Sequence, residues 1–410
     1  MSGRRVVVTG LGPVTSVGVG AKEFHAGQLE GRSAVRALGR FDASGLPVRI
    51  GAEVDLPDGL RPERRDAVIS DRVTHLAAAA AGLALRDAGL DLDAVDRERV
   101  GVVLGTGCGG AESIRANAAA ALVGGGRVGA RFVPMSMSNS PAAWIAIRHG
   151  LGGPVTTSVT ACASGADALV TAHQMIVADE ADVVLAGGAE APLTDLLVSG
   201  FARMKALSAR NDEPGRASRP FDRDRTGFVL GEGAAVLVLE SAGHARARGA
   251  RPLAELLGYG RTGDAHHIVA PRPDGSAAAR AVTRALRSAG LAPGEVSHVN
   301  AHGTGTVLND AAEAAALHRA LGAAAARVPV TATKSMTGHT LGAAGAVEAV
   351  AAVQALMYQV VPPTANLDHP DPELGLDVVA GEPRDVSVSA VLSSSFAFGG
   401  HNVVLAFGRS

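Results

Sequence analysis

The segment VTTSVTACASGADALVTAHQMIVA, residues 155–178, carries the clearest structural signal in the chain. It begins with a β-branched run that predicts a buried strand, continues through small residues that predict a tight turn, and ends in an Ala-rich run that predicts a buried helix. The segment VPVTATKSMTGHTLGAAGAVEAVAAVQALMY, residues 328–358, repeats the same order. Two copies of one strand–turn–helix pattern indicate a duplicated α/β unit.

Other segments repeat as well. A strand followed by a Gly-rich turn is predicted at 100–110 and again at 296–305. A similar apolar run lies near the end of each half, at 234–240 and at 402–408. These echoes place the same elements in the same order along both halves of the chain.

We therefore predict an α/β fold with two halves, residues 1–250 and 251–410, whose sheets are buried on both faces. A Gly turn is expected directly after the first strand, and a surface loop at 207–226. The predicted strands lie at 5–9, 100–104, 155–159, 183–186, 234–239, 296–300, 328–333, 388–394 and 402–407, and the predicted helices at 72–88, 163–178, 276–289, 311–321 and 341–358.

Composition excludes several classes of protein. The 410 residues include 38 Lys and Arg against 40 Asp and Glu, a formal charge of -2, and only 3 % are aromatic. That balance excludes a general binder of nucleic acid or of anionic membranes, and the few aromatics argue against base stacking. No run of roughly 18 uncharged apolar residues occurs, so we expect no membrane association. Two cysteines cannot build a disulfide framework, and we expect a cytoplasmic protein.

Familiar cofactor motifs fail in this chain. GTGCGG at 105–110 formally matches a dinucleotide-binding turn, but residues 119–130 contain no acid to hold a ribose. Neither tyrosine has Lys four residues later, and no lysine follows a glycine as a Walker A loop requires. His266 and His267 lack further ligands at metal spacing. We therefore expect no bound cofactor and no metal.

The reactive candidates follow predicted strands. Cys162 opens a helix, where the positive end of the helix dipole favours a thiolate, although a buried structural Cys explains it equally well when it is taken alone. His302, in NAHGTGT, and His339, in KSMTGH, stand beside glycines at equivalent strand ends. Lys334 can supply a compact positive charge or orient an imidazole ring. The turn SFAFGG at 395–400 can aim backbone N–H groups at an oxyanion.

One cysteine with two histidines suits acyl transfer through a thioester. The same two imidazoles can donate N–H groups to the enolate that forms when a malonyl group loses CO₂. A Cys–His–Asp protease would instead use one base and one orienting acid or amide.

At these residues the chain resembles the β-ketoacyl-acyl carrier protein synthases of the elongating type II kind, in the thiolase superfamily. The matching motifs span essentially the whole chain: VTGLGPVTSVG near the start, TACASG around Cys162, RPFDRDRTGFVLGEG at 219–233, NAHGTGT around His302, KSMTGHTLGAAGAVEA at 334–349 and FAFGGHN at 396–402. The resemblance implies a thiolase-like fold whose duplicated halves form α-β-α-β-α layers. It also implies a decarboxylating Claisen condensation of an acyl chain on Cys162 with malonyl-acyl carrier protein.

The resemblance implies a role for each site residue. Cys162 accepts the acyl chain, and His302 and His339 stabilise the enolate. Lys334 is the supporting cation, and the backbone N–H groups of Cys162 and Phe398 form an oxyanion hole. Two acids, Glu313 and Glu348, support the lysine. The positions that match substrate contacts are Thr304, Thr306, Phe228, Cys108, Phe396 and Phe398.

The resemblance also implies partners. Substrates travel on the phosphopantetheine of an acyl carrier protein, which is acidic and therefore needs basic docking residues. The candidates for docking are Arg61, Arg64, Arg65, Arg203 and Lys205. The chain is expected to form a dimer, with itself or with a related subunit, and Met135, Met137 and Trp144 fall in the segment that helps to close the partner's acyl tunnel.

Three positions depart from the family pattern. Ala397 replaces a glycine of a gating loop, Cys108 replaces a larger aliphatic residue that limits the acyl pocket, and Val269 replaces a threonine that touches the pantetheine arm. These changes fit a type II polyketide or polyene ketosynthase as well as fatty acid synthesis. Two other interpretations stay open. A non-catalytic chain-length partner usually lacks the reactive Cys, and a coenzyme A thiolase needs a second cysteine late in the chain, where none follows Cys162.

Overall fold

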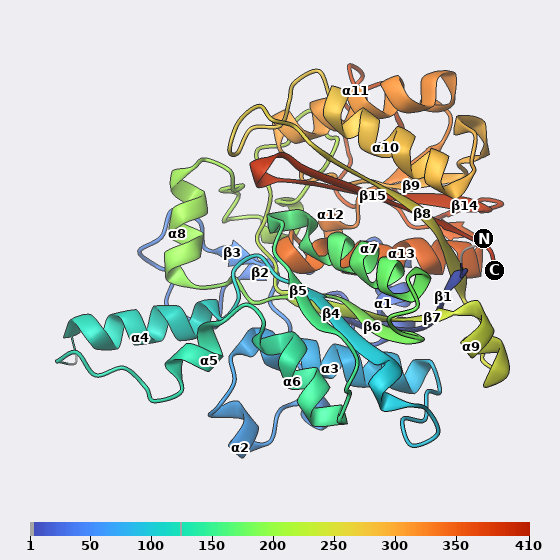
Figure 1. The fold of residues 1–410 in the computed structure, drawn as a ribbon. Helices are drawn as coiled ribbons and strands as arrows, with labels where there is room; N and C mark the ends of the chain where they lie inside the picture. The colour runs from blue at the N-terminus through green and yellow to red at the C-terminus, as the bar shows by residue number, and fades with distance from the viewer. Residues whose placement is uncertain (1–3, 124) are drawn as a thin grey trace.

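The computed structural model describes residues 4–123 and 125–410, so residues 1–3 and 124 of the predicted first half lie outside the described residues. Helices and sheets stack in five layers, helix–sheet–helix–sheet–helix (Figure 1). This arrangement is the duplicated α/β fold that the sequence predicts.

Two sets of strands share one spatial order. The first runs β5-β4-β6-β7-β1, and the second runs β10-β9-β14-β15-β8 with the short β12 at its edge. Strands β1 and β8 pair briefly and join the two sets edge to edge. The bounds are β1 Val6–Val14, β4 Val100–Gly105, β5 Val155–Ser158, β6 Val183–Glu190, β7 Gly233–Ser241, β8 Ala254–Gly263, β9 His298–Asn300, β10 Pro329–Thr331, β12 Asp377–Val378, β14 Ala390–Ala397 and β15 His401–Gly408.

The strands that repeat in the sequence occupy equivalent places in the two sets. Strands β4 and β9 correspond, as do β5 and β10, and β7 and β15. The helices α7 (Ser164–Val177) and α13 (Ala344–Tyr358), which follow β5 and β10, lie side by side between the sheets (Figure 1). The two halves therefore present their strand–turn–helix segments to each other at the centre of the molecule.

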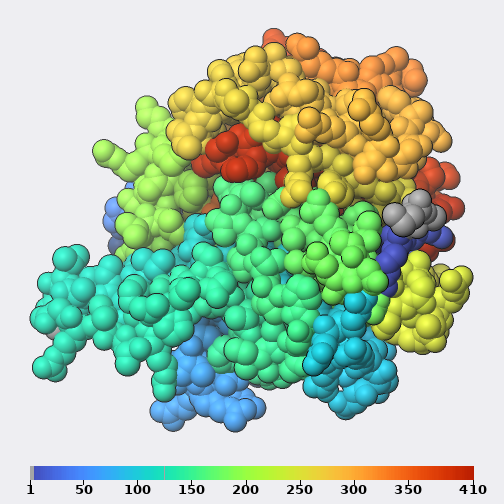
Figure 2. Space-filling view, viewed as in Figure 1, coloured from blue at the N-terminus to red at the C-terminus, as the bar shows by residue number. Residues whose placement is uncertain are grey.

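The outer layers are amphipathic helices. Helices α3 (Arg72–Asp87) and α6 (Ser140–His149) cover the first sheet, and α10 (Ser276–Ala289) and α11 (Val307–Leu321) pack together on the second. The arm formed by α4 and α5 stands away from the body (Figure 2). The remaining elements are α1 Ala21–Leu29, α2 Arg64–Ala67, α4 Ala111–Val123, α5 Phe132–Ser136, α8 Asp195–Arg203, α9 Ala242–Ala247, α12 Lys334–Thr337, β2 Arg36–Ala37, β3 Ile50–Gly51, β11 Val360–Val361 and β13 Arg384–Asp385.

Helix α13 has no solvated polar face, and its two polar residues within the core, Glu348 and Gln354, are buried and hydrogen-bonded. Each of its residues from Ala344 to Leu356 is buried. The segment Leu341–Tyr358 is long and apolar enough to cross a membrane, but 89 % of it is buried inside the protein. A helix without a polar face belongs in a core, and here the two sheets cover it.

The first strand is longer than the sequence predicts. It continues through Gly10 and Gly12 to Val14 instead of turning at Gly10. The glycines serve close packing, because a Cβ on Gly12 would lie 2.0 Å from the carbonyl oxygen of Ala80 in α3. Strand β8 is missed altogether, since its sequence AELLGYGRTG contains one β-branched residue and three glycines.

The expected surface loop at 207–226 is also wrong in part. Its residues 217–222 are buried. Arg219 and Asp222, 3 % and 0 % exposed, form an ion pair, and Arg225 bonds Asp371 at 2.7 Å. Pairing of the charges makes burial of this polar segment possible.

Candidate active site

The catalytic candidates and Phe398 follow the carboxyl ends of strands. Cys162 follows β5 in the short helix Ala161–Ala163, and His302 follows β9. After β10 comes α12, which begins at Lys334, and then His339. Phe398 follows β14. Because β5 and β10 hold equivalent places in the two halves, the nucleophile and His339 approach each other from opposite halves.

These side chains converge on one cavity of about 300 Å³. Its lining includes most of the substrate and catalytic candidates: Cys162, Phe228, His302, Thr304, Thr306, His339, Phe396 and Phe398. Ala397, Val269 and Lys205 also line it. Lys334, Glu313 and Glu348 lie behind the histidines, fully buried. Cys108 does not line the cavity; it packs against the apolar cluster that contains Cys162.

Cys162 is a neutral thiol in the resting protein. Ala161, which precedes it, has φ of 51°, an unusual conformation for a residue with a Cβ. Burial raises the pKa of Cys162 to about 12, against the opposing effect of the Lys334 charge. The thiolate expected from the helix start is therefore not the resting form, because desolvation disfavours the charged state.

Both histidines are neutral and carry their proton on the same ring nitrogen. Burial and the charge of Lys334 hold the pKa of His302 and of His339 well below the ordinary value. The Lys334 ammonium donates to Nδ1 of His302 at 3.1 Å, and the N–H of Leu341 donates to Nδ1 of His339 at 3.3 Å. With Nδ1 accepting in each ring, the proton of each neutral ring lies on Nε2. The rings stand nearly perpendicular, with centroids 5.4 Å apart.

Lys334 is held by a buried network. Its ammonium forms an ion pair with Glu348 and donates to the carbonyl oxygen of His302 at 2.5 Å. Burial raises the pKa of Glu348 to about 7, and the charge of Lys334 opposes that rise. Glu313 accepts the backbone N–H groups of His302 and Gly303, both at 2.8 Å, so it fixes the His302 turn instead of contacting the lysine.

Two backbone N–H groups meet at the nucleophile. Those of Phe398 and of Cys162 itself act to lower the pKa of the Cys162 thiol, against the larger effect of burial. The turn that follows Phe398 needs glycine, because Gly399 and Gly400 have φ of 80° and 75°. Ala397 has extended φ and ψ, -121° and 158°, so a side chain fits there without strain.

The cavity walls are polar at one side and aromatic at the other. Thr304 and Thr306 bond each other through their hydroxyls at 3.0 Å. Phe228 packs edge-to-face on His339, with ring centroids 5.2 Å apart. Such a wall can accept an amide-bearing arm beside an apolar chain.

The docking candidates do not form one patch within a single chain. Lys205 lines the cavity and Arg203 ends the nearby α8, whereas Arg64 and Arg65 lie in α2, on a separate part of the molecule (Figure 1). Arg61 is exposed next to α2. Met135 and Met137 lie at α5 and Trp144 lies in α6; none of the three lines the cavity.

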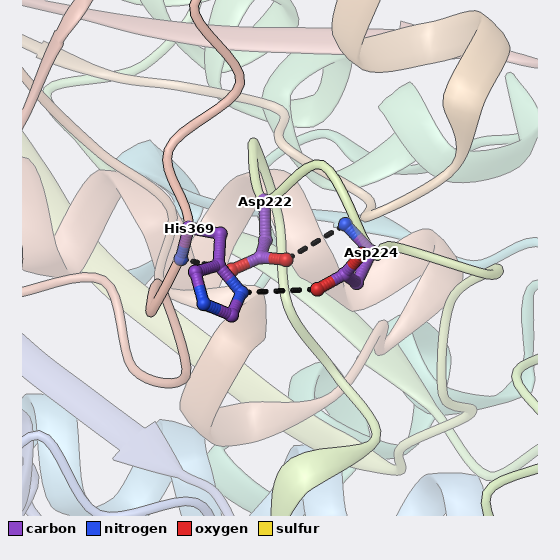
Figure 3. A group of neighbouring side chains, drawn as sticks. All are labelled: Asp222, Asp224 and His369. Atoms are coloured by element: carbon purple, nitrogen blue, oxygen red, sulfur yellow. Dashed lines mark hydrogen bonds and ion pairs between the residues drawn. The ribbon is translucent and has the colours of Figure 1, made fainter.

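One acid–histidine group has metal-like spacing within the described residues. Asp222, Asp224 and His369 bring one ligand atom each within 4.8 Å of one another (Figure 3). Asp222 already accepts the backbone N–H groups of Asp224, Asp368 and His369, and His369 pairs with Asp224 at 3.0 Å. These hydrogen bonds join the loop at 222–224 to the loop at 368–369, which accounts for the cluster, and we assign no metal to it.

Two site residues escape prediction from the sequence. Leu341, with φ of 43°, orients His339, and Glu190 bonds loops of both halves. An acid directly after the apolar run VVLAGGA is the one signal that could have pointed to Glu190.

Comparisons with known proteins agree with this geometry. The model of the beta-ketoacyl synthase N-terminal domain matches residues 3–245, and that of the C-terminal domain matches residues 253–368. A Synechocystis protein named 3-oxoacyl-[acyl-carrier-protein] synthase 2 is 45 % identical over 98 % of both chains. The solved ishigamide ketosynthase/chain length factor superposes with TM-score 0.93 at 36 % identity, over 100 % of both chains. A type II polyketide ketosynthase in complex with its acyl-carrier protein gives TM-score 0.92 at 33 % identity, also over 100 % of both.

Proposed function

Because the chain belongs to the β-ketoacyl synthase family, we propose that it extends acyl chains by decarboxylating condensation with malonyl-acyl carrier protein. One observation carries the mechanism: a thiol, two neutral imidazole donors and two backbone N–H groups surround one cavity. The presence of all three side chains argues against a non-catalytic chain-length partner.

The first half-reaction is thioester exchange. The Cys162 sulfur attacks the carbonyl carbon of an acyl-carrier thioester, and the backbone N–H groups of Cys162 and Phe398 hold the oxyanion. Collapse transfers the acyl group to Cys162 and releases the carrier thiol, which ends with the proton that Cys162 gave up. Loss of that proton is required because the resting side chain is a thiol.

The second half-reaction forms the carbon–carbon bond. A malonyl group loses CO₂, and the electron pair moves into an enolate whose oxygen accepts from Nε2–H of His302 and of His339. The enolate carbon attacks the acyl carbonyl on Cys162. The Cys162 sulfur leaves as a thiolate, takes up a proton, and the β-ketoacyl product stays on the carrier.

Lys334 supports this step without contacting the substrate. Its donation to Nδ1 of His302 fixes the tautomer, and its charge adds to the larger effect of burial in keeping the pKa of both rings low. Neutral rings remain hydrogen-bond donors throughout, so they stabilise the enolate and do not quench it by proton transfer.

We further propose the setting of the reaction. The chain works in the cytoplasm as a dimer, with itself or with a related subunit, and receives its substrates from an acyl carrier protein. Relatives with both kinds of assembly partner, a chain length factor and an acyl-carrier protein, support this. Val269 in the cavity lining fits a type II polyketide or polyene pathway as well as fatty acid synthesis, and Cys108, which does not line the cavity, does not distinguish the two.

Mass spectrometry tests the proposal. The purified chain is incubated with a panel of acyl-carrier proteins, and the mass of the peptide containing Cys162 is measured. Acyl adducts on Cys162, followed by β-ketoacyl product when malonyl-carrier protein is added, are expected. Condensation by a Cys162→Ala protein would contradict the proposed function. The native mass of the complex shows whether the protein forms a homodimer or a heterodimer.

A further inference from the structure

Glu190 is a fully buried acid at the carboxyl end of β6, and no step of the condensation uses it. Its carboxylate accepts from the Thr106 hydroxyl at 2.9 Å and from the N–H groups of Gly107 and Cys108 at 2.6 and 3.0 Å. It also accepts from the N–H of Gly342 at 2.8 Å. The first three donors belong to the loop after β4 in the first half, and Gly342 belongs to the second half. One carboxylate therefore joins the two halves beside the cavity.

The turn that Glu190 holds in the second half is strained. Leu341 has φ of 43°, in the left-handed region that favours glycine. Its N–H donates to Nδ1 of His339, so the conformation of Leu341 sets the direction of that ring. Strained residues persist only where their surroundings fix them. The bond from Gly342 to Glu190 fixes the peptide that follows Leu341.

The two loops reach the carboxylate because both carry glycine. A Cβ on Gly342 would lie 2.5 Å from Oε2 of Glu190 and 2.4 Å from the backbone nitrogen of Gly107. A Cβ on Gly107 would lie 2.9 Å from the same oxygen. The contact is therefore a direct one between backbone and carboxylate, with little freedom for either loop to shift.

The loop of the first half also supports the nucleophile. The hydroxyl of Ser164 lies 3.3 Å from the carbonyl oxygen of Thr106 and 2.6 Å from that of Ala161, the residue before Cys162. Burial raises the pKa of Glu190, and its four hydrogen-bond donors oppose that rise; in its charged form Glu190 raises the pKa of Cys162, in addition to the larger effect of burial on the thiol. Glu190 is thus coupled to both reactive groups.

We infer that Glu190 is a positioning residue for condensation, which clamps the turn that orients His339 against the loop beside Cys162. The inference rests on the proposed function, since it is expressed through the rate of decarboxylation. Glu190 contacts no reacting atom and acts through Gly342 and Leu341. Glu190→Gln keeps the size of the side chain but turns one acceptor oxygen into an NH₂ group, which faces N–H donors.

The test compares two buried acids in the full chain. Glu240→Gln is the matched control, because Glu240 is also 0 % exposed and its partners, Thr9, His244 and Arg248, lie outside the cavity lining. For Glu190→Gln we expect malonyl-carrier decarboxylation to fall about 10- to 100-fold, the loss that a small misplacement causes. For Glu240→Gln we expect a change within about threefold.

The pH dependence of Cys162 alkylation is a second measurement, and it would not change if Glu190 had only a structural role. Loss of the nearby negative charge shifts the profile of Glu190→Gln to lower pH, and Glu240→Gln keeps the wild-type profile. The inference is overturned if decarboxylation by Glu190→Gln stays within about threefold of wild type, or if its alkylation profile coincides with that of Glu240→Gln. A wild-type chain that neither decarboxylates nor condenses overturns the proposed function instead.

A second variant covers a failure of Glu190→Gln to fold. Thr106→Val removes one donor to Glu190 and leaves the charge in place. We expect a several-fold loss of decarboxylation that Thr106→Ser restores. Wild-type rates in the Thr106→Val protein overturn the inference.

Discussion

Removal of His339 tests the two-donor description of the enolate site most directly. Its Nδ1 accepts from the N–H of Leu341, which leaves Nε2–H as the hydrogen-bond donor of a ring that lines the cavity. His339→Ala deletes this donor and keeps His302 with its lysine. One donor aimed at a developing oxyanion is worth about 10² to 10³ in rate, roughly 2.7 to 4 kcal/mol. We expect the rate of malonyl-carrier decarboxylation to fall by that factor.

Release of CO₂ from malonyl-carrier protein without an acyl donor isolates this step, since no bond to Cys162 is needed. His298→Ala is the matched control: His298 is 1 % exposed on β9, bonds the Pro329 carbonyl at 3.0 Å and does not line the cavity. We expect the control to stay within about threefold of wild type. A His339→Ala protein that keeps more than about a tenth of the wild-type rate refutes the reasoning.

Four further outcomes follow from the same geometry. Cys162→Ala abolishes condensation but still releases CO₂ from malonyl-carrier protein, measured in parallel assays; loss of both activities contradicts the separation of the two half-reactions. With its pKa raised to about 12, Cys162 reacts with iodoacetamide about tenfold faster for each pH unit between roughly pH 7 and 11, and a plateau below about pH 9 contradicts a buried thiol. Lys334→Met leaves Glu348 buried without its partner, and we expect the free energy of unfolding in denaturant titration to fall by about 3–5 kcal/mol. The double variant Lys334→Met/Glu348→Leu should regain this stability but not activity. Equal stability of the single and double variants argues against the ion pair. Gly342→Ala should lower the free energy of unfolding by about 1–3 kcal/mol or more, because the added Cβ would lie 2.4 Å from the backbone nitrogen of Gly107. Gly294→Ala is the neutral control in the same thermal melts, because nothing lies within 4 Å of a Cβ at Gly294.

The sequence predicts those parts of the site that depend on local pattern. A β-branched run, a small-residue turn and an Ala-rich helix place Cys162 and His339 at equivalent strand ends, and the structure has both there. The order of strands in the two sheets follows the same repeats. Local pattern is enough here because Cys162 follows β5 closely, and His339 follows β10 after the short helix α12, each within one repeated strand–turn–helix segment.

Contacts between the halves escape such prediction. Glu190 bonds Gly342, 152 positions away, and nothing near either residue in the sequence signals the pair. The resting state of Cys162 is missed for a related reason, since desolvation depends on everything that packs around the thiol and outweighs the helix dipole. Burial within the expected loop at 207–226 is missed because the ion partners of Arg219 and Arg225, Asp368 and Asp371, come from a distant loop.

The turn that carries the nucleophile has a counterpart in the second half of the chain, and this counterpart limits how many acyl groups one polypeptide can bind. Ala161 and Leu341 share the left-handed conformation just before α7 and α13, and the residues that directly follow them correspond to each other, Cys162 in one half and Gly342 in the other. The backbone of Gly107 fills the space where a side chain of residue 342 would lie. Only the first copy therefore has a side chain that can accept an acyl group, so we expect each polypeptide to carry a single acyl group at a time.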